Sequence, residues 1–143
     1  MSTADDHFAI IATLDRYAEC LDTRDWEGLG DVFTGDISLD FVPAFKASGL
    51  DEVRVAISSF LDGCGPSMHL LGNYRIVLDG DTASSKCYCN VMHQGKGEHE
   101  GKHYENWIEY VDQLIRTPMG WRSSSRVATP RMEAGDISLL GPG

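Results

Sequence analysis

The chain has 143 residues, of which 42% are hydrophobic, and it carries a formal net charge of −10 at pH 7. This length suits one domain with a buried core and room for a pocket. The balance of 12 Lys and Arg against 22 Asp and Glu argues against nucleic acid or an anionic membrane as a partner, because both need clustered basic side chains. The polar N-terminus and the lack of a long apolar run predict a cytoplasmic protein.

The first half of the chain shows helical periodicity. The predicted helices cover residues 6–21, 26–33 and 50–61. Between the second and the third, residues 37–41 alternate between apolar and polar side chains, which is typical of a half-buried strand.

The second half of the chain reads as β-sheet. The predicted strands cover residues 69–78, 82–94, 102–115 and 121–129, joined by turn signals and one polar loop. Helices grouped before strands favour an α+β fold, a cone-shaped barrel in which a curved, mostly antiparallel sheet wraps around three N-terminal helices. A pocket is expected at the open end of the cone. We expect one domain over residues 1–143, with a core over about 6–130 and a loosely held tail over 135–143.

Two histidines and an upstream aspartate are the candidate acid/base groups. His69 and His93 lie on predicted strands, and Asp22 lies in the polar break after the first helix. A histidine acts as a general base near neutral pH, and a carboxylate on its second nitrogen stabilises the imidazolium that forms. His93 would protonate a leaving hydroxide or hold a developing enolate. The competing interpretation of Asp22 is a helix cap, although Asp25 directly precedes the second helix and is better placed for that role.

The cysteines offer a different interpretation. Cys87, Cys89 and His93 share strand parity and so could ligate zinc. A second ligand pair is missing, and the sequence contains no phosphate loop, dinucleotide fingerprint or zincin motif. We therefore expect neither a metal nor another cofactor, and no disulfide in a cytoplasmic setting.

Several further side chains are candidates for binding a substrate. Tyr104 and Asn106 share the uncharged face of strand 102–115, which should point into the cone and offer hydrogen bonds to a ligand. Arg126 either clamps an anion or a carbonyl at the pocket mouth or pairs with a surface carboxylate, and surface pairing is the favoured alternative. The apolar residues that suit either a pocket wall or the core are Phe41, Val42, Phe45, Phe60, Met68, Leu71 and Met92.

Local strings from one end of the chain to the other carry a family resemblance. They are Tyr17, Leu21-Asp22-Thr23-Arg24-Asp25-Trp26, Val32-Phe33, His69-Leu70-Leu71-Gly72-Asn73, Leu78-Asp79-Gly80-Asp81-Thr82-Ala83 and Thr117-Pro118-Met119-Gly120-Trp121-Arg122. Together with the order of elements, they resemble the nuclear transport factor 2-like superfamily, and within it the SnoaL-like and scytalone dehydratase-like branch. That superfamily hosts several kinds of enzyme as well as binding proteins, so the resemblance is more specific for fold than for chemistry.

The resemblance also implies roles for individual residues. Asp22 matches the carboxylate of a Tyr-Asp-x-x-Asp-Trp motif, His69 matches the histidine of a His-x-x-Gly motif, and His93 looks like the second active-site histidine. The two tyrosines that orient a water in scytalone dehydratase are replaced by Leu21 and Phe41, which argues against the same substrate. Proton abstraction by the Asp–His pair is unaffected by that departure.

The expected function is a cofactor-independent dehydratase or isomerase that acts on a hydrophobic, cyclic or polyketide-like carbonyl compound. Tyr17 and Phe41 are expected beside the substrate. The alternatives are a SnoaL-like cyclase or dehydrochlorinase, a non-catalytic ligand-binding or assembly domain, and the small subunit of a ring-hydroxylating dioxygenase. Trp107 on the uncovered face of the sheet predicts a homodimer or homotrimer.

Overall fold

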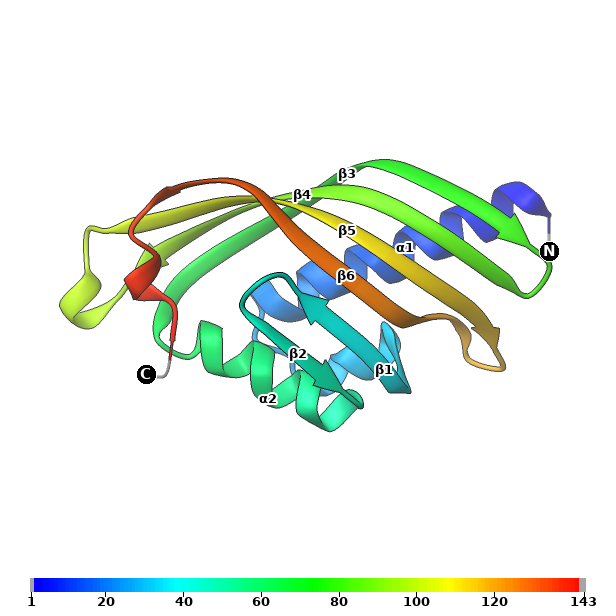
Figure 1. Ribbon diagram of the computed structural model, residues 1–143, viewed down its shortest axis with the longest axis horizontal. Helices are drawn as coiled ribbons and strands as arrows, with labels where there is room; N and C mark the ends of the chain where they lie inside the picture. Colours follow the sequence, from blue (N-terminus) through cyan, green and yellow to red (C-terminus); the bar gives the residue numbers. More distant parts are fainter. Residues whose placement is uncertain (1, 142–143) are drawn as a thin grey trace.

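The structure is a computed structural model that describes residues 2–141 (Figure 1). Its elements in chain order are α1 (Thr3–Asp22), η1 (Glu27–Asp31), β1 (Phe33–Phe41), β2 (Phe45–Ser48), α2 (Leu50–Leu61), β3 (Cys64–Asp79), β4 (Thr82–Gly95), η2 (Gly97–His99), β5 (His103–Thr117), β6 (Gly120–Gly135) and η3 (Ile137–Leu139), where η marks a 3-10 helix. Within residues 2–141, neither α-helix combines the length and the apolar character that crossing a membrane requires.

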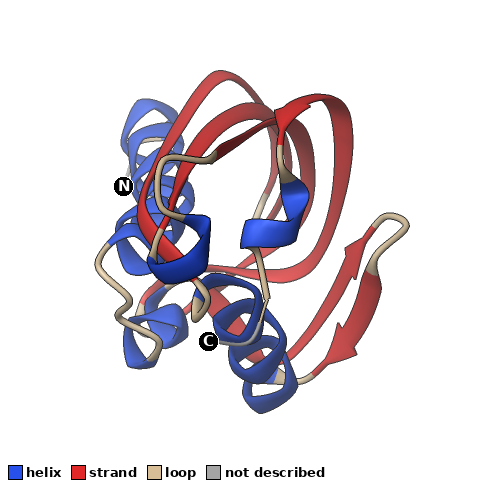
Figure 2. Ribbon diagram, turned by 90° about the vertical axis from the view of Figure 1, so that its left-hand side faces the viewer, coloured by secondary structure: helices blue, strands red, loops and turns tan. Residues whose placement is uncertain are grey.

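The six strands form one curved sheet in the order β2-β1-β6-β5-β4-β3. β1 runs parallel to β6, and all other neighbours are antiparallel. The sheet curls around without closing, so β2 and β3 remain as its two edges (Figure 2). α1 packs along β3, and α2 packs against β1 and β2. The predicted α+β fold with a curved sheet is confirmed, although the sheet is an open one.

Helix α1 begins and packs as its sequence dictates. Ser2 and Asp5 form a capping box, in which the Ser2 hydroxyl accepts from the Asp5 amide and the Asp5 carboxylate accepts from the Ser2 amide, so orphan amides of the first turn gain partners. The side chains that face the sheet recur at helical spacing. They are Ile10, Leu14, Tyr17 and Leu21, each with at most 3% of its surface exposed.

Bulges bend the long strands into the curved shape. The register between β3 and β4 shifts between Gly72 and Arg75, where Asn73 takes a left-handed backbone conformation with φ of 57°. The pairing of β5 with β6 shifts after Trp107 and again after Gln113. Because a bulge bends its strand and increases the local twist, the sheet acquires a concave side on which α1 packs.

Beyond shifts in strand bounds, the structure departs from the predicted elements in two ways. The second helix is a 3-10 helix of five residues, Glu27–Asp31, instead of an α-helix over 26–33, because Gly28 and Gly30 disfavour a longer helix. The strand β2, Phe45–Ser48, was not predicted, since four residues beside a proline turn leave too short a pattern to detect. The sheet therefore covers two α-helices and one 3-10 helix where three helices were expected.

The C-terminal segment is held in place, in contrast to the loose tail that was expected. Leu139 is buried with 1% exposure. The Gly141 amide donates to the carbonyl of Phe60 at 2.8 Å, and the Gly63 amide donates to the carbonyl of Gly141 at 2.7 Å. Main-chain hydrogen bonds of this kind cannot be predicted from amino-acid composition, and the glycine content of the tail suggested a loosely held segment. Residues 142–143 lie outside the described part.

Candidate active site

A cavity of about 510 Å³ lies between the concave side of the sheet, α2 and the C-terminal segment. Its walls are mainly apolar and aromatic. Polar groups converge on it from several elements, and these are Tyr17, His69, His93, Tyr104, Asn106, Tyr110, Arg131 and Glu133. A concave, largely apolar pocket with a few convergent polar groups is typical of a small-molecule site.

Asp22 and His69 form a closely bonded pair at this cavity. Asp22 Oδ1 lies 2.6 Å from His69 Nδ1, and Asp22 Oδ2 accepts the main-chain amide of His69 at 2.8 Å. Burial raises the pKa of Asp22, but the hydrogen bonds from His69 and Ser67 outweigh it and hold the pKa below its usual value. The ionised carboxylate accepts only, so His69 Nδ1 carries the hydrogen, and in the neutral imidazole the lone pair is then on Nε2. The structure thus brings together the predicted base and its carboxylate.

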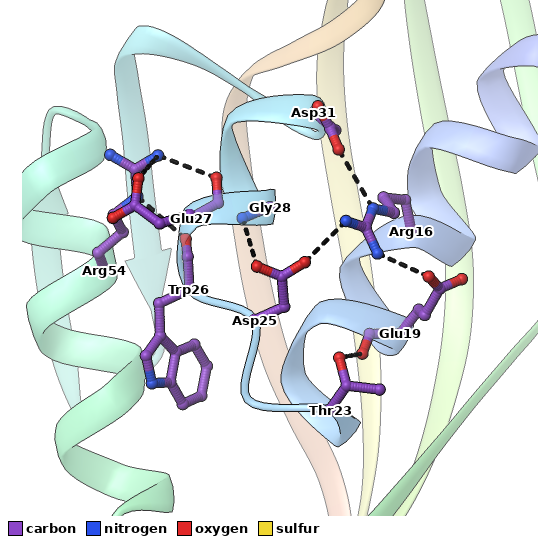
Figure 3. A network of polar contacts seen from close by, with 9 residues as sticks. All are labelled: Arg16, Glu19, Thr23, Asp25, Trp26, Glu27, Gly28, Asp31 and Arg54. Atoms are coloured by element: carbon purple, nitrogen blue, oxygen red, sulfur yellow. Dashed lines mark hydrogen bonds and ion pairs between the residues drawn. The ribbon is translucent and has the colours of Figure 1, made fainter.

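Asp22 is free for this role because Asp25 supports the next turn instead. Asp25 accepts the amide of Gly28 at 2.9 Å and an Arg16 guanidinium hydrogen at 2.9 Å (Figure 3). Asp25 was expected to cap this helix; it does bond to the first turn, but the N-cap position itself is Trp26, which makes no side-chain cap bond. Arg16 also pairs with Asp31, which ties η1 to α1 and holds the end of the helix where Asp22 meets β3.

His93 faces the same cavity from β4, with 4% of its surface exposed. Its Nδ1 lies 3.0 Å from the main-chain oxygen of Tyr104. A carbonyl oxygen only accepts, so Nδ1 carries the hydrogen. Burial lowers the pKa of His93 to about 4, and the ring is therefore neutral at pH 7. His93 then offers the cavity the Nε2 lone pair, an acceptor, which differs from the donor role expected from the sequence.

The two imidazoles stand almost perpendicular to each other. Their ring centroids are 6.0 Å apart with an interplanar angle of 84°. Tyr17 packs edge-on against His69, with centroids 6.4 Å apart, and Tyr104 stacks on His93. Aromatic neighbours on both sides restrict the rotation of each imidazole, so the site is organised before any ligand enters.

Asn106 and Tyr104 supply the other polar groups near the histidines. Asn106 Oδ1 is buried and has no hydrogen-bond partner within residues 2–141. The Tyr104 hydroxyl donates to Glu133 Oε2 at 2.6 Å, so its oxygen can only accept from a ligand. Both predicted residues line the cavity, as do Tyr17 and Phe41.

The family model of the SnoaL-like domain matches residues 2–127. The chain belongs to the SnoaL-like family. A Mycobacterium tuberculosis protein described as uncharacterized is 32% identical over 126 residues, which cover 87% of this chain and 84% of that one.

Solved structures show the same fold. A candidate scytalone dehydratase from Novosphingobium aromaticivorans superimposes with a TM-score of 0.83 at 20% identity, covering 93% of this chain and 89% of that one. A hexachlorocyclohexane dehydrochlorinase superimposes with a TM-score of 0.83 at 12% identity, covering 93% and 90%. Another relative from N. aromaticivorans is described as a nuclear transport factor 2-like protein with a cystatin-like fold.

Arg126 takes a place in this SnoaL-like protein that the sequence did not predict. It does not line the cavity, and its side chain and that of Asp112 are both fully buried. Arg126 Nε lies 3.0 Å from Asp112 Oδ2, and the guanidinium packs 4.4 Å from the Tyr17 ring centroid and 4.2 Å from that of Tyr110. Both expectations, a clamp at the mouth and a surface ion pair, are wrong, because strand parity does not reveal that β6 lies in the middle of the sheet.

The apolar residues that were expected in a pocket wall or the core fall into two groups, one at the cavity or the core and one on the outer face of the sheet. Phe41, Val42, Phe45 and Phe60 line the cavity, and Phe45 stacks on both Phe41 and Phe60. Leu71 packs against the core. Met68 and Met92 are exposed on the outer face, since they have the opposite parity to His69 and His93 along their strands.

The four cysteines are free and buried. Burial raises the pKa of Cys87 to about 12 and that of Cys89 to about 11, so both thiols are protonated at neutral pH. Within residues 2–141, no three His, Cys, Asp or Glu side chains stand close enough to hold a metal ion.

Three polar residues near the SnoaL-like site were missed. Ser67 donates to Asp22 Oδ1 at 3.0 Å, Arg24 donates to Ser67 at 2.8 Å, and Glu133 accepts from Tyr104. Ser67 shares strand parity with His69, and Arg24 lies within the string that contains Asp22. Those two signals were available in the sequence, whereas Glu133 lies beyond the predicted end of its strand.

Proposed function

We propose that this protein is a cofactor-independent dehydratase or isomerase that abstracts a proton next to a carbonyl of a hydrophobic cyclic compound. The single observation that supports this most strongly is the 2.6 Å contact between Asp22 and His69 Nδ1 at the cavity wall. It directs the hydrogen of the neutral imidazole to Nδ1, so that Nε2 is the basic nitrogen, and it supplies a carboxylate for the imidazolium that follows.

The proposed reaction uses His69 twice. Nε2 takes the proton from the carbon next to the carbonyl, and the electron pair moves to the carbonyl oxygen to give an enolate. In dehydration the enolate expels the β-hydroxyl group, and the imidazolium returns the proton to it, so that water leaves and an enone remains. In isomerisation the imidazolium returns the proton to a different carbon. Asp22 stabilises the positive ring throughout and keeps its charge.

The polar groups that line the cavity include several that can only accept hydrogen bonds, which favours a substrate that carries hydroxyl groups. His93 Nε2 and Tyr104 Oη can only accept, and Asn106 Oδ1 is a further acceptor without a partner in the described residues. Buried acceptors are costly when left unpaired, and a ligand hydroxyl would satisfy them. The apolar remainder of the cavity suits a ring system, and its volume falls within the usual range for small-molecule pockets, about 300 to 1,000 Å³.

The likeness to a candidate scytalone dehydratase and to a dehydrochlorinase also supports elimination chemistry, because both names denote the loss of a small molecule from neighbouring carbons. A second candidate function is dehydrohalogenation. The observation that favours it is the neutral, acceptor-only His93, since a halide leaves without the proton that a hydroxide needs.

Two probe reactions test the proposal. 3-Hydroxy-1-tetralone loses water to give 1-naphthol, which is followed by fluorescence, and 2-tetralone in D₂O reports proton abstraction alone by NMR. We expect the wild type to accelerate at least one of them and His69→Gln to lower that rate by about 10² to 10⁴, the usual range for one acid/base group. The 3-chloro analogue of the first probe distinguishes loss of halide.

The result that would contradict the proposal is tight binding of these ketones with no exchange or elimination above the His69→Gln level. That outcome would favour the alternative of a non-catalytic ligand-binding domain.

A further inference from the structure

Arg24 stands in an unusual backbone conformation directly after helix α1. Its φ is 57°, in the left-handed region that a residue with a side chain seldom occupies unless its surroundings stabilise it. In this conformation the guanidinium contacts the start of β3. Nη2 donates to the carbonyl of Gly65 at 2.6 Å, while Nη1 donates to the carbonyl of Leu21 at 2.6 Å and to the Ser67 hydroxyl at 2.8 Å.

The Ser67 hydroxyl connects this guanidinium to Asp22. Ser67 Oγ accepts from Arg24 Nη1 and lies 3.0 Å from Asp22 Oδ1. Arginine has only donors and an ionised carboxylate has only acceptors, so the single hydroxyl hydrogen must point to Asp22. Arg24 and the Asp22 carboxylate therefore fix the direction of both hydrogen bonds of Ser67: the hydroxyl oxygen accepts from Arg24, and the hydroxyl hydrogen goes to Asp22.

The Asp22 carboxylate consequently has three donors. Oδ2 accepts the His69 amide, and Oδ1 accepts both the Ser67 hydroxyl and His69 Nδ1. Without Ser67, His69 Nδ1 would be the remaining donor to Oδ1. No ion pair joins Arg24 to Asp22 directly within 4 Å in the described residues, so the hydroxyl also separates the two charges and leaves Asp22 paired with His69.

We propose that Ser67 and Arg24 are positioning residues that orient the Asp22 carboxylate toward His69. Ser67 anchors Oδ1, and Arg24 anchors Ser67 from the other side. The consequence for turnover rests on the proposed function, while the orientation of the carboxylate is measurable without any substrate.

The test measures the exchange of the His69 Nδ1 hydrogen with water by NMR. We expect Ser67→Ala to speed this exchange by about tenfold or more, because the carboxylate loses an anchor, and Ser67→Thr to restore slow exchange because it keeps the hydroxyl. Arg24→Leu should act in the same direction as Ser67→Ala, with Arg24→Lys intermediate. Thr23→Val is the matched control, since it removes a neighbouring hydroxyl whose one bond within residues 2–141 goes to the main-chain oxygen of Glu19. Amide spectra verify that each variant is folded.

A purely structural role would lower the unfolding temperature of Ser67→Ala and leave the exchange rate unchanged, and this result would overturn the inference. Failure of Ser67→Thr to restore protection would overturn it as well. If turnover of a probe ketone is found, Ser67→Ala should lower kcat by about 10- to 100-fold, the range known for outer partners that orient functional histidines in metal sites, with KM little changed. A protected Nδ1 hydrogen in a wild type without turnover would reject the proposed function and retain the positioning.

Discussion

Nδ1 of His93 donates to the main-chain oxygen of Tyr104 at 3.0 Å, and this bond decides what the second histidine can do. The neutral ring presents the Nε2 lone pair to the cavity, whereas His93 could act as a donor or an acid there only if this buried ring were protonated. Of the two cavity histidines, only His69 has a carboxylate partner among the described residues. His69 is therefore the group placed to transfer a proton, and His93 is placed to accept a hydrogen bond from the ligand.

The buried His93 should make stability depend on pH. Its pKa is lowered by burial to about 4 from 6.5, so between these values the unfolded chain binds a proton that the folded protein does not. Stability is lost as the pH falls through that window, by about 3 kcal/mol. Urea unfolding of the wild type from pH 7.5 to pH 4 should show this loss. His93→Asn keeps a donor for the Tyr104 carbonyl, and its free energy of unfolding should fall less over this pH range. An equal fall in both proteins would show that the pKa of His93 is not lowered by folding.

Asp22 and His69 should behave as one unit in catalysis. Once a probe reaction is detected, Asp22→Asn should lower kcat by at least about 10²-fold while ligand binding persists, because the amide cannot stabilise the imidazolium. His69→Ala should be at least as damaging. The double variant should lower kcat little more than the worse single change does, as for other residues that act together. Losses that multiply would return Asp22 to a structural role.

The buried pair of Arg126 and Asp112 should be sensitive to removal of one partner. Both side chains are inaccessible to solvent, and Ser123 donates a further hydrogen bond to Asp112 at 2.7 Å. Asp112→Leu leaves an unpaired buried charge and should lower the free energy of unfolding by about 3 to 5 kcal/mol. Combining it with Arg126→Met should recover part of that loss, as measured by urea titration. A double variant less stable than Asp112→Leu would show that the cation supports the core by itself.

The outer face of the sheet should bury itself in a homodimer or homotrimer. Leu70, Trp107 and Met132 lie in one row across the sheet, with Asn90 of β4 between Leu70 and Trp107, and 72%, 41% and 61% of their surfaces are exposed. Large apolar side chains gathered on an uncovered sheet face are typical of an interface. Light scattering should give a multiple of 15.7 kDa at micromolar concentration, and Trp107→Lys should shift it toward the monomer. Phe8→Lys, a change of an exposed residue on α1, is the control, and a monomeric wild type would reject the assembly.

The sequence predicted the features that depend on periodicity and local strings. Asp22, His69 and His93 converge as expected because helix end and strand parity are local properties. The prediction for Arg126 was wrong because the environment of this residue depends on which strands are paired. β1 pairs with β6 in parallel, and a hairpin signal in the sequence cannot predict such a pairing. The role of His93 required the position of the Tyr104 carbonyl on the neighbouring strand, which side-chain patterns do not encode.

¹⁵N and ¹H NMR of the His69 ring in the free protein at neutral pH would establish which ring nitrogen carries the hydrogen. We predict a protonated Nδ1 with a strongly downfield hydrogen, as expected for a short bond to a carboxylate, and an unprotonated Nε2. Asp22→Asn should abolish the downfield signal. A His69 ring protonated at Nε2 and bare at Nδ1 would contradict the account, because the cavity would then face a donor where a base is required.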